Sequence, residues 1–245
     1  MPERTGEVVA AWRSLGLTND PRVVIDVVAA FAAGTTAERG LVLAAGTGAI
    51  AAFIDGDSMV RRAGGRGWLV GDEGSAVWLG VEGVRAALLA LDRRGPSTSL
   101  AEAIPVALGL NIGPNVDVAT RITDVVYGQA PALLGRLAPL VVAAGDRGDQ
   151  VALALVARAS DHLLETAIAA AGDEEPVVVV LGGSVLRGAH AISERVRAGV
   201  HEHWPDAEVV RTGSGEAGAV ALAIRAAGME VTRTVLRHLR EGARA

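Results

Sequence analysis

The pattern of apolar and polar residues changes several times along the first quarter of the chain. Residues 7–15 carry apolar side chains at helical spacing, which predicts a short amphipathic helix. The β-branched run Arg22–Ile25 predicts a short strand that ends in Asp26, and the small residues after it predict a helix that stops at Gly34. A second apolar run, Gly40–Ala45, predicts another strand.

The loop Gly46-Thr47-Gly48 follows that strand, and Asp55-Gly56 lies between two further apolar stretches. Asp-Gly is a strong signal for a two-residue hairpin, so the pattern predicts strand, Gly loop, strand, hairpin and strand. The sequence also fits the G-x-G-x-x-A fingerprint of dinucleotide-binding sites. In those sites a helix follows the loop, whereas here the pattern predicts a strand. We therefore favour a strand-to-strand turn, whose bare backbone and Thr hydroxyl can contact a phosphate.

Longer periodic segments predict that the rest of the chain is mainly helical. The expected helices begin at Ser75 and then cover Leu100–Leu108, Asp117–Tyr127, Ala130–Ala144, Gly148–Ala171, Gly188–Val200 and Ala219–Leu239. The apolar run Pro176–Leu181 is typical of a strand buried on both faces, and it leads into Gly182-Gly183-Ser184. A short strand is expected at Glu208–Val210 and a loop at Gly213–Gly218. The fold class is α/β.

Composition excludes several chemistries. The 245 residues contain no Cys, and all 23 basic residues are Arg. A P-loop lysine, a Schiff base, a disulfide framework and a Cys-ligated metal or iron–sulfur cluster are therefore excluded. The net charge of −5 and the absence of a basic stripe argue against a nucleic-acid partner. Neither a signal peptide nor a membrane-spanning apolar run is evident, so we expect no membrane association and a cytoplasmic protein.

Two carboxylates are candidates for chemistry. Asp26 follows a predicted strand, at the sheet edge where open α/β sheets bind ligands, although Asp is also a favoured helix N-cap. Asp72 lies in a Gly-rich loop before a helix, where it could accept hydrogen bonds from sugar hydroxyls. For Glu73 we favour a structural role, in which its negative charge complements the helix dipole. The five His are scattered, and no metal site is predicted.

Five blocks in a fixed order resemble the BadF/BadG/BcrA/BcrD ATPase family, and within it the N-acetylglucosamine kinases. The blocks are IDVVAAFAAG, LVLAAGTGAIAAFIDG, GGRGWLVGDEGSAVWLG, AAGDRGD and VVVVLGGSV, and a Gly- and Ala-rich helix follows them. The resemblance covers nearly the whole chain, and G-D-E-G-S with its Gly-rich prelude is its most specific part. It implies the actin-like ATPase (ribonuclease H-like) fold.

The resemblance implies an ATP-dependent N-acetylglucosamine kinase-like phosphotransferase, which moves the γ-phosphate of ATP to an amino sugar such as N-acetylglucosamine or glucosamine. Asp26 matches the family's catalytic aspartate, the general base for the sugar hydroxyl. The ATP-binding loops match Gly46, Thr47, Gly48, Gly182, Gly183 and Ser184, and the substrate loop matches Gly65, Gly67 and Asp72. Mg²⁺ is expected to bridge the phosphates, because phosphoryl transfer depends on positioning and charge neutralisation.

Three features depart from the family pattern. The family's D-G-G-G-T hairpin, which holds the first phosphate loop, does not occur in the sequence. Arg66 stands where these kinases often have Trp, and Ala49-Ile50 where they often have Ser-Asn. The resemblance thus implies a remnant of the N-terminal lobe at residues 1–40, a complete C-terminal lobe at 41–225 and a terminal helix at 226–245.

These departures leave a second function open, that of a catalytically inactive sugar-binding or regulatory relative without the first phosphate loop. The family's other branch, the activators of 2-hydroxyacyl-CoA dehydratases, is excluded because its iron–sulfur cluster needs Cys. A lobe that leaves a sheet face or edge uncovered would also favour a homodimer or aggregation.

Overall fold

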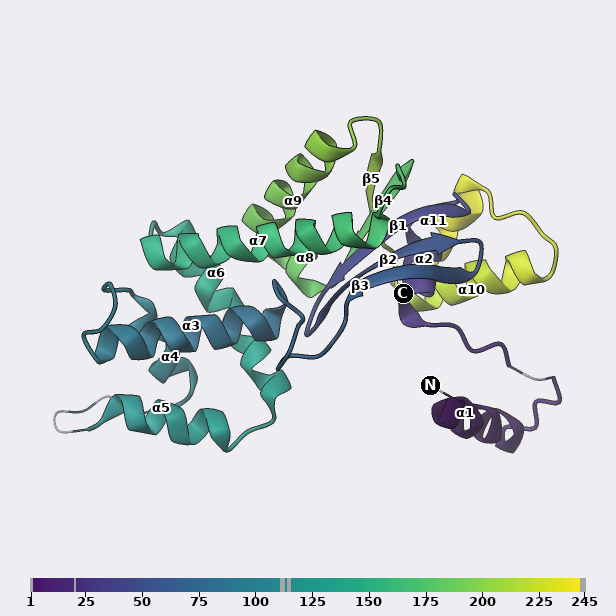
Figure 1. Ribbon diagram of the computed structural model, residues 1–245. Helices are drawn as coiled ribbons and strands as arrows, with labels where there is room; N and C mark the ends of the chain where they lie inside the picture. The colour runs from purple at the N-terminus through teal and green to yellow at the C-terminus, as the bar shows by residue number, and fades with distance from the viewer. Residues whose placement is uncertain (1, 20, 111–112, 114–115, 243–245) are drawn as a thin grey trace.

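The centre of the molecule is a mixed sheet of five strands in the order β3-β2-β1-β4-β5. The computed structural model describes residues 2–19, 21–110, 113 and 116–242. The strands are β1 Arg39–Ala45, β2 Ala49–Asp55, β3 Ser58–Gly64, β4 Val178–Gly182 and β5 Glu208–Arg211. β1, β2 and β3 form an antiparallel meander, whereas β4 pairs parallel with β1 and β5 parallel with β4 (Figure 1).

The meander has the strands that the sequence predicts, and one of its two turns lies one residue later than predicted. The β1–β2 pairing runs from Arg39↔Asp55 to Ala45↔Ala49, so residues 46–48 make the turn between the two strands. A two-residue hairpin joins β2 and β3 as predicted, but Asp55 pairs with Ser58, so its turn residues are Gly56 and Asp57; Gly56 has φ of +59°, the left-handed conformation that suits glycine. A strand, not a helix, follows the Gly46–Gly48 loop, which excludes a dinucleotide-binding βα turn there.

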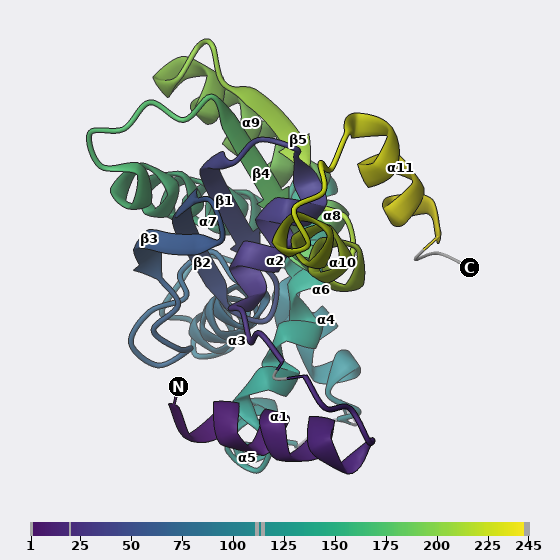
Figure 2. The ribbon, with the colours of Figure 1, turned by 90° about the vertical axis from the view of Figure 1, so that its right-hand side faces the viewer.

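The sheet is covered on both faces because its central strands alternate between two cores. Leu41 and Leu43 of β1 belong to a core with α7 and α9, while Val42 between them belongs to a core with α2, α10 and α11. Figures 1 and 2 show α7 along one face and α2 with α10 on the other. All five residues of β4 are buried, as its continuous apolar run predicts.

The helices mostly fall where the periodicity predicts them. They are α1 Pro2–Ser14, α2 Asp26–Gly34, α3 Ala76–Leu91, α4 Leu100–Ala107, α5 Val118–Tyr127, the 3₁₀ helix η1 Pro131–Leu137, α6 Ala138–Asp146, α7 Gln150–Ala171, α8 Ser184–Gly188, α9 His190–His203, α10 Gly215–Ala226 and α11 Arg233–Gly242. The N-terminal α1 lies apart from the sheet in Figure 1. Among the described residues, no helix is long and apolar enough to cross a bilayer.

Asp149 joins the start of α7 to the segment before α4. One carboxylate oxygen accepts hydrogen bonds from the amides of Val151 and Ala152, and the other accepts from Thr98 and Ser99. Burial disfavours the charged form, but these hydrogen bonds outweigh it and lower the pKa of Asp149 from 3.8 to about 2.

The prediction of a strand at Arg22–Ile25 is wrong. This segment is extended but pairs with no strand in the described structure, and Ile25 is the N-cap of α2 with φ of −72° and ψ of 142°. A β-branched run becomes a strand only where a neighbour accepts its backbone hydrogen bonds. Asp26 is therefore the first residue of a helix and does not follow a sheet strand.

Three of the expected helices are divided or displaced. Ala130–Ala144 forms η1 and then α6, with Pro139 in the first turn of α6, where its missing amide hydrogen costs no helical hydrogen bond. Gly188–Val200 is replaced by α8 and α9. The final helix starts early, at Gly215 inside the predicted loop, because Ser214 caps α10, and it is interrupted at Gly228, whose φ is +74°.

Candidate functional site

One pocket collects most of the candidate residues. It has a volume of about 500 Å³ and opens at the edge of the sheet where the Gly loops lie. Eight of the ten predicted site residues line it: Asp26, Gly46, Thr47, Gly48, Gly65, Gly67, Asp72 and Gly183. We call it the central pocket.

The two Gly loops meet there because β1 and β4 are parallel neighbours. Strands that run side by side in one direction end at the same edge, so the loops that follow them are adjacent. A Cβ on Gly46 would lie 3.7 Å from the Ser184 Oγ, which shows how near the β1 loop is to the β4 loop. The pocket is thus formed by segments more than a hundred residues apart in the sequence.

Gly183 is required by the contact between these loops. Its φ is +90°, and a Cβ on it would run into the carbonyl oxygen of Ala45 at the end of β1. Any other residue would push the β4 loop away from β1 and strain the backbone. The backbone of this loop is consequently held close to the turn that carries Thr47.

Asp72 is buried and contacts the Gly-rich loop at Gly67. Only 9% of the residue is exposed, and its φ of +59° is uncommon for a residue other than glycine. Its Oδ1 accepts a hydrogen bond from the Gly67 amide at 3.2 Å, and a Cβ on Gly48 would lie 2.6 Å from its Oδ2. The carboxylate therefore lies against the Gly46–Gly48 turn, with one oxygen near each loop.

Asp26 faces the central pocket from the start of α2. The residue is exposed, and its Oδ1 accepts a hydrogen bond from the Val27 amide at 2.9 Å. The alternative that the sequence offered, an N-cap role for Asp26, is wrong, because Ile25 is the N-cap and Asp26 is the first helical residue. The catalytic role of Asp26 stays a prediction; its other carboxylate oxygen has no partner among the described residues and is free to meet a ligand in the pocket.

Ser184 and Gly182 do not line the central pocket. Ser184 lines a neighbouring cavity of about 320 Å³, formed mainly by apolar side chains of α3, α6 and α8. Gly182 packs against Thr212, since a Cβ on it would lie 2.9 Å from the Thr212 Cγ2. The β4 loop thus separates the central pocket from what we call the apolar cavity.

Sequence reasoning missed several residues of the central pocket. Arg187, on α8 one turn after Ser184, is the one cation among the described residues that line it. Thr212, Gly213 and Gly215 lie between β5 and α10, and the Thr212 hydroxyl donates to the Ala30 carbonyl at 2.7 Å. Arg187 follows the Gly182-Gly183-Ser184 loop by three residues, and this spacing could have identified it as a residue of the pocket.

The N-terminus of α10 adds a positive end to the same wall. Hydrogen bonds to Glu216 from its own backbone amide and from the Ser214 hydroxyl lower the pKa of the Glu216 carboxyl. Because the Ser214 hydroxyl also accepts from the Ala217 amide, the start of α10 is already capped by its own side chains, and only the positive end of the helix dipole favours an anion here. The described residues contain no group of three His, Cys, Asp or Glu that could hold a metal ion by themselves.

Comparison with known proteins gives a family and several relatives. The family model described as the BadF/BadG/BcrA/BcrD ATPase family matches residues 23–223. The chain is 27% identical over 218 residues to an N-acetylmuramic acid/N-acetylglucosamine kinase of Clostridium acetobutylicum, covering 86% of this chain and 69% of that protein. It is also 27% identical over 219 residues to an N-acetyl-D-glucosamine kinase of Dictyostelium discoideum, covering 86% of this chain and 67% of that protein.

A solved structure from Chromobacterium violaceum, named as a candidate N-acetylglucosamine kinase, has a TM-score of 0.65 to this chain at 27% identity. The match covers 80% of this chain, which spans 64% of that one. The predicted α/β class and actin-like ATPase fold are thereby confirmed. The predicted division into residues 1–40, 41–225 and 226–245 stays a prediction.

Proposed function

The chain belongs to the BadF/BadG/BcrA/BcrD ATPase family, and we propose that it acts as an ATP-dependent sugar kinase. The substrate would be an amino sugar such as N-acetylglucosamine or glucosamine, which accepts the γ-phosphate of ATP. The observation that carries the proposal is the gathering of Asp26, the Gly46–Gly48 turn and Asp72 around one pocket.

ATP would lie along the edge of the sheet, across the two Gly loops. The apolar cavity beside Ser184 is a suitable place for a flat purine, since its lining is mostly Ala, Leu and Val. The phosphates would then extend past Gly183 into the central pocket, where backbone amides and the Thr47 hydroxyl can donate to them. Arg187 would add a guanidinium, which suits phosphate oxygens.

The sugar would occupy the side of the central pocket formed by Gly65, Gly67 and Asp72. The buried Asp72 carboxylate can accept hydrogen bonds from two neighbouring hydroxyls. Asp26, with one oxygen held by the Val27 amide, would take the proton of the attacking hydroxyl with the other. The pocket would mainly position the reactants, as phosphoryl transfer requires.

Mg²⁺ fits this donor set as a partner of the phosphates. Mg²⁺ usually binds substrate phosphates, one or two carboxylates and several waters. Asp26 and Asp72 are the carboxylates that line the central pocket among the described residues, and Asp26 has the more exposed side chain. When bound, the ion would neutralise charge on the phosphate oxygens.

The test is ADP release from ATP and Mg²⁺ with a panel of amino sugars and plain hexoses. Asp26→Asn should lower kcat by a factor of about 10²–10⁴, the usual contribution of a general base. Asp72→Asn should mainly raise KM for the sugar. Glu73→Gln is the matched control, because Glu73 is the next residue but lies outside the central pocket.

Calorimetry separates this proposal from the inactive relative. Binding of an amino sugar without binding of Mg²⁺-ATP would support the sugar-binding alternative. Turnover that Asp26→Asn leaves unchanged would refute the role of Asp26, and turnover of no sugar by a chain that binds ATP would refute the kinase.

A further inference from the structure

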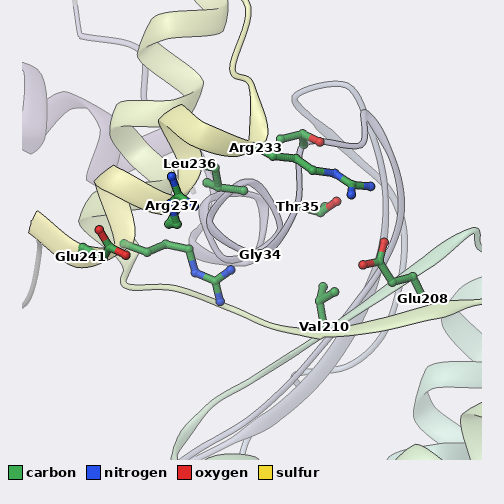
Figure 3. A pocket seen from close by; sticks show the side chains of 10 residues that line it. Gly34, Thr35, Glu208, Val210, Arg233, Leu236, Arg237 and Glu241 are labelled. Carbon is green, nitrogen blue, oxygen red and sulfur yellow. The ribbon is translucent and has the colours of Figure 1, made fainter.

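A second hollow lies between the last helix and the edge of the sheet. It has a volume of about 430 Å³ and is enclosed by α11, by β5 and by the end of α2 at Gly34 and Thr35. Figure 3 shows it with Arg233 extending from α11 and Thr35 beside it, Arg237 further along the helix, and Glu208 and Val210 across from the helix. We call it the arginine groove.

Three arginines of α11 line this groove. Arg233, Arg237 and Arg240 stand at i, i+4 and i+7, so they share one face of the helix. Leu236, on the same face, is buried in the core beside α2 and α10. The apolar base of the helix therefore fixes the positions from which the guanidinium groups extend.

The guanidinium groups have few partners of their own. Arg240 donates to the Arg211 carbonyl at 2.7 Å. Within the described part of the chain, no ion pair or hydrogen bond occupies the side chains of Arg233 and Arg237. Other exposed arginines of the protein pair with carboxylates: Arg39 with Glu174 at 2.9 Å, and Arg195 with Asp161 at 3.0 Å.

The opposite wall is polar and held in place. Arg225 of α10 donates to the carbonyls of Thr35 and Thr36 at 3.4 and 3.2 Å, which fixes the segment after α2. Both threonines line the groove together with the carboxylates of Glu208 and Glu241. Glu208 on β5 lies across the groove from the three arginines, whereas Glu241 is on α11 with them.

We propose that the arginine groove binds a small phosphate ester that also carries hydroxyl or amino groups, such as a phosphorylated amino sugar. Guanidinium groups bind phosphate oxygens through paired, charge-assisted hydrogen bonds. Glu208 and the threonine hydroxyls supply acceptors for the other substituents, which a plain anion would not use. The volume is in the range of small-molecule sites and is too small for a folded partner.

The groove has a direct connection to the central pocket. It touches α2 at Gly34, and α2 begins at Asp26. The Gly213 amide also donates to the Ala33 carbonyl at 3.1 Å, joining the end of α2 to the wall of the central pocket. A ligand in the groove would therefore lie against the end of the helix whose first residue is Asp26.

The experiment is calorimetric titration of the whole chain with glucosamine 6-phosphate, inorganic phosphate and unphosphorylated glucosamine. We expect glucosamine 6-phosphate to bind most tightly, and its affinity to fall as salt is raised. The variant Arg233→Gln/Arg237→Gln should weaken binding by about tenfold or more, since two charge-assisted contacts are lost. Glu208→Gln should strengthen the binding of inorganic phosphate by about threefold, because a like charge is removed.

Two controls keep this site separate from the central pocket. Asp72→Asn should leave the groove's binding unchanged, so the result stands whether or not the proposed kinase activity is found. Arg121→Gln removes an exposed arginine on α5, far from α11 in Figure 1, and should also have no effect. Thermal unfolding checks that each variant is folded.

Absence of saturable binding up to about 10 mM would overturn the proposal. So would binding that Arg233→Gln/Arg237→Gln leaves intact or that Asp72→Asn abolishes. Equal affinity for inorganic phosphate and glucosamine 6-phosphate would refute the ligand class.

Discussion

Gly218 offers a sharp test of how α10 holds α2 in position. A Cβ on Gly218 would run into the carbonyl oxygen of Ala29 in α2, and would lie 2.7 Å from the carbonyl carbon and 3.1 Å from the Cα of that residue. Ordinary Cβ contacts begin near 3.4 Å. Because the atoms it meets belong to the backbone, no rotamer change relieves the overlap, and the helices must separate by on the order of 1 Å.

Gly218→Ala should therefore destabilise the fold although alanine favours helices. Overpacking of this kind costs about 3 kcal/mol at the upper end of its usual range, and the gain in helix propensity is about 1 kcal/mol. The net loss of about 2 kcal/mol lowers Tm by about 4–8 °C for a chain of this size. Thermal and urea unfolding, followed by circular dichroism, measure both quantities.

Gly215→Ala is the matched control in the same helix, since a Cβ there meets nothing within 4 Å. It should leave stability unchanged or raise it by up to about 1 kcal/mol. If Gly218→Ala is as stable as the wild type, or if the two variants behave alike, the close packing of α10 on α2 is refuted. Because α2 begins at Asp26, a destabilised but folded Gly218→Ala should also lose activity under the proposed function.

Three further changes probe the site and its supports. Gly48→Ala should displace the Asp72 carboxylate and weaken sugar binding by about tenfold, while Tm changes little; unchanged affinity would contradict the contact between the two loops. Asp149→Ala should remove about 1 kcal/mol at neutral pH. Since the pKa of Asp149 is lowered from 3.8 to about 2, this stabilisation is present above about pH 4 and is lost as pH falls toward 2, so the variant should show a flatter pH profile of unfolding there. Ser75→Ala removes the buried cap of α3 and should cost about 1–2 kcal/mol by urea unfolding, whereas Ser58→Ala, at an exposed strand end, should cost almost nothing.

Local patterns were sufficient for the elements that local physics governs. Apolar runs predict β1 and β4, and Asp55-Gly56 predicts the hairpin, because strand and turn preferences act over a few residues. The family resemblance, together with the Gly loops and the two carboxylates, pointed to eight residues that line the central pocket. The strand prediction for Arg22–Ile25 was wrong, because a β-branched run forms a strand only where a neighbouring strand pairs with it.

The sequence by itself determined the α/β class, the Gly loops and the set of carboxylates available for chemistry. Only the tertiary structure decided that β1 and β4 are parallel neighbours, which brings their two loops to one edge of the sheet. It also decided that Asp72 lies against Gly48, that Arg187 faces the same pocket, and that the arginines of α11 turn toward β5. These relations depend on backbone pairing and close packing between distant segments, and no local pattern encodes which distant segment becomes the neighbour.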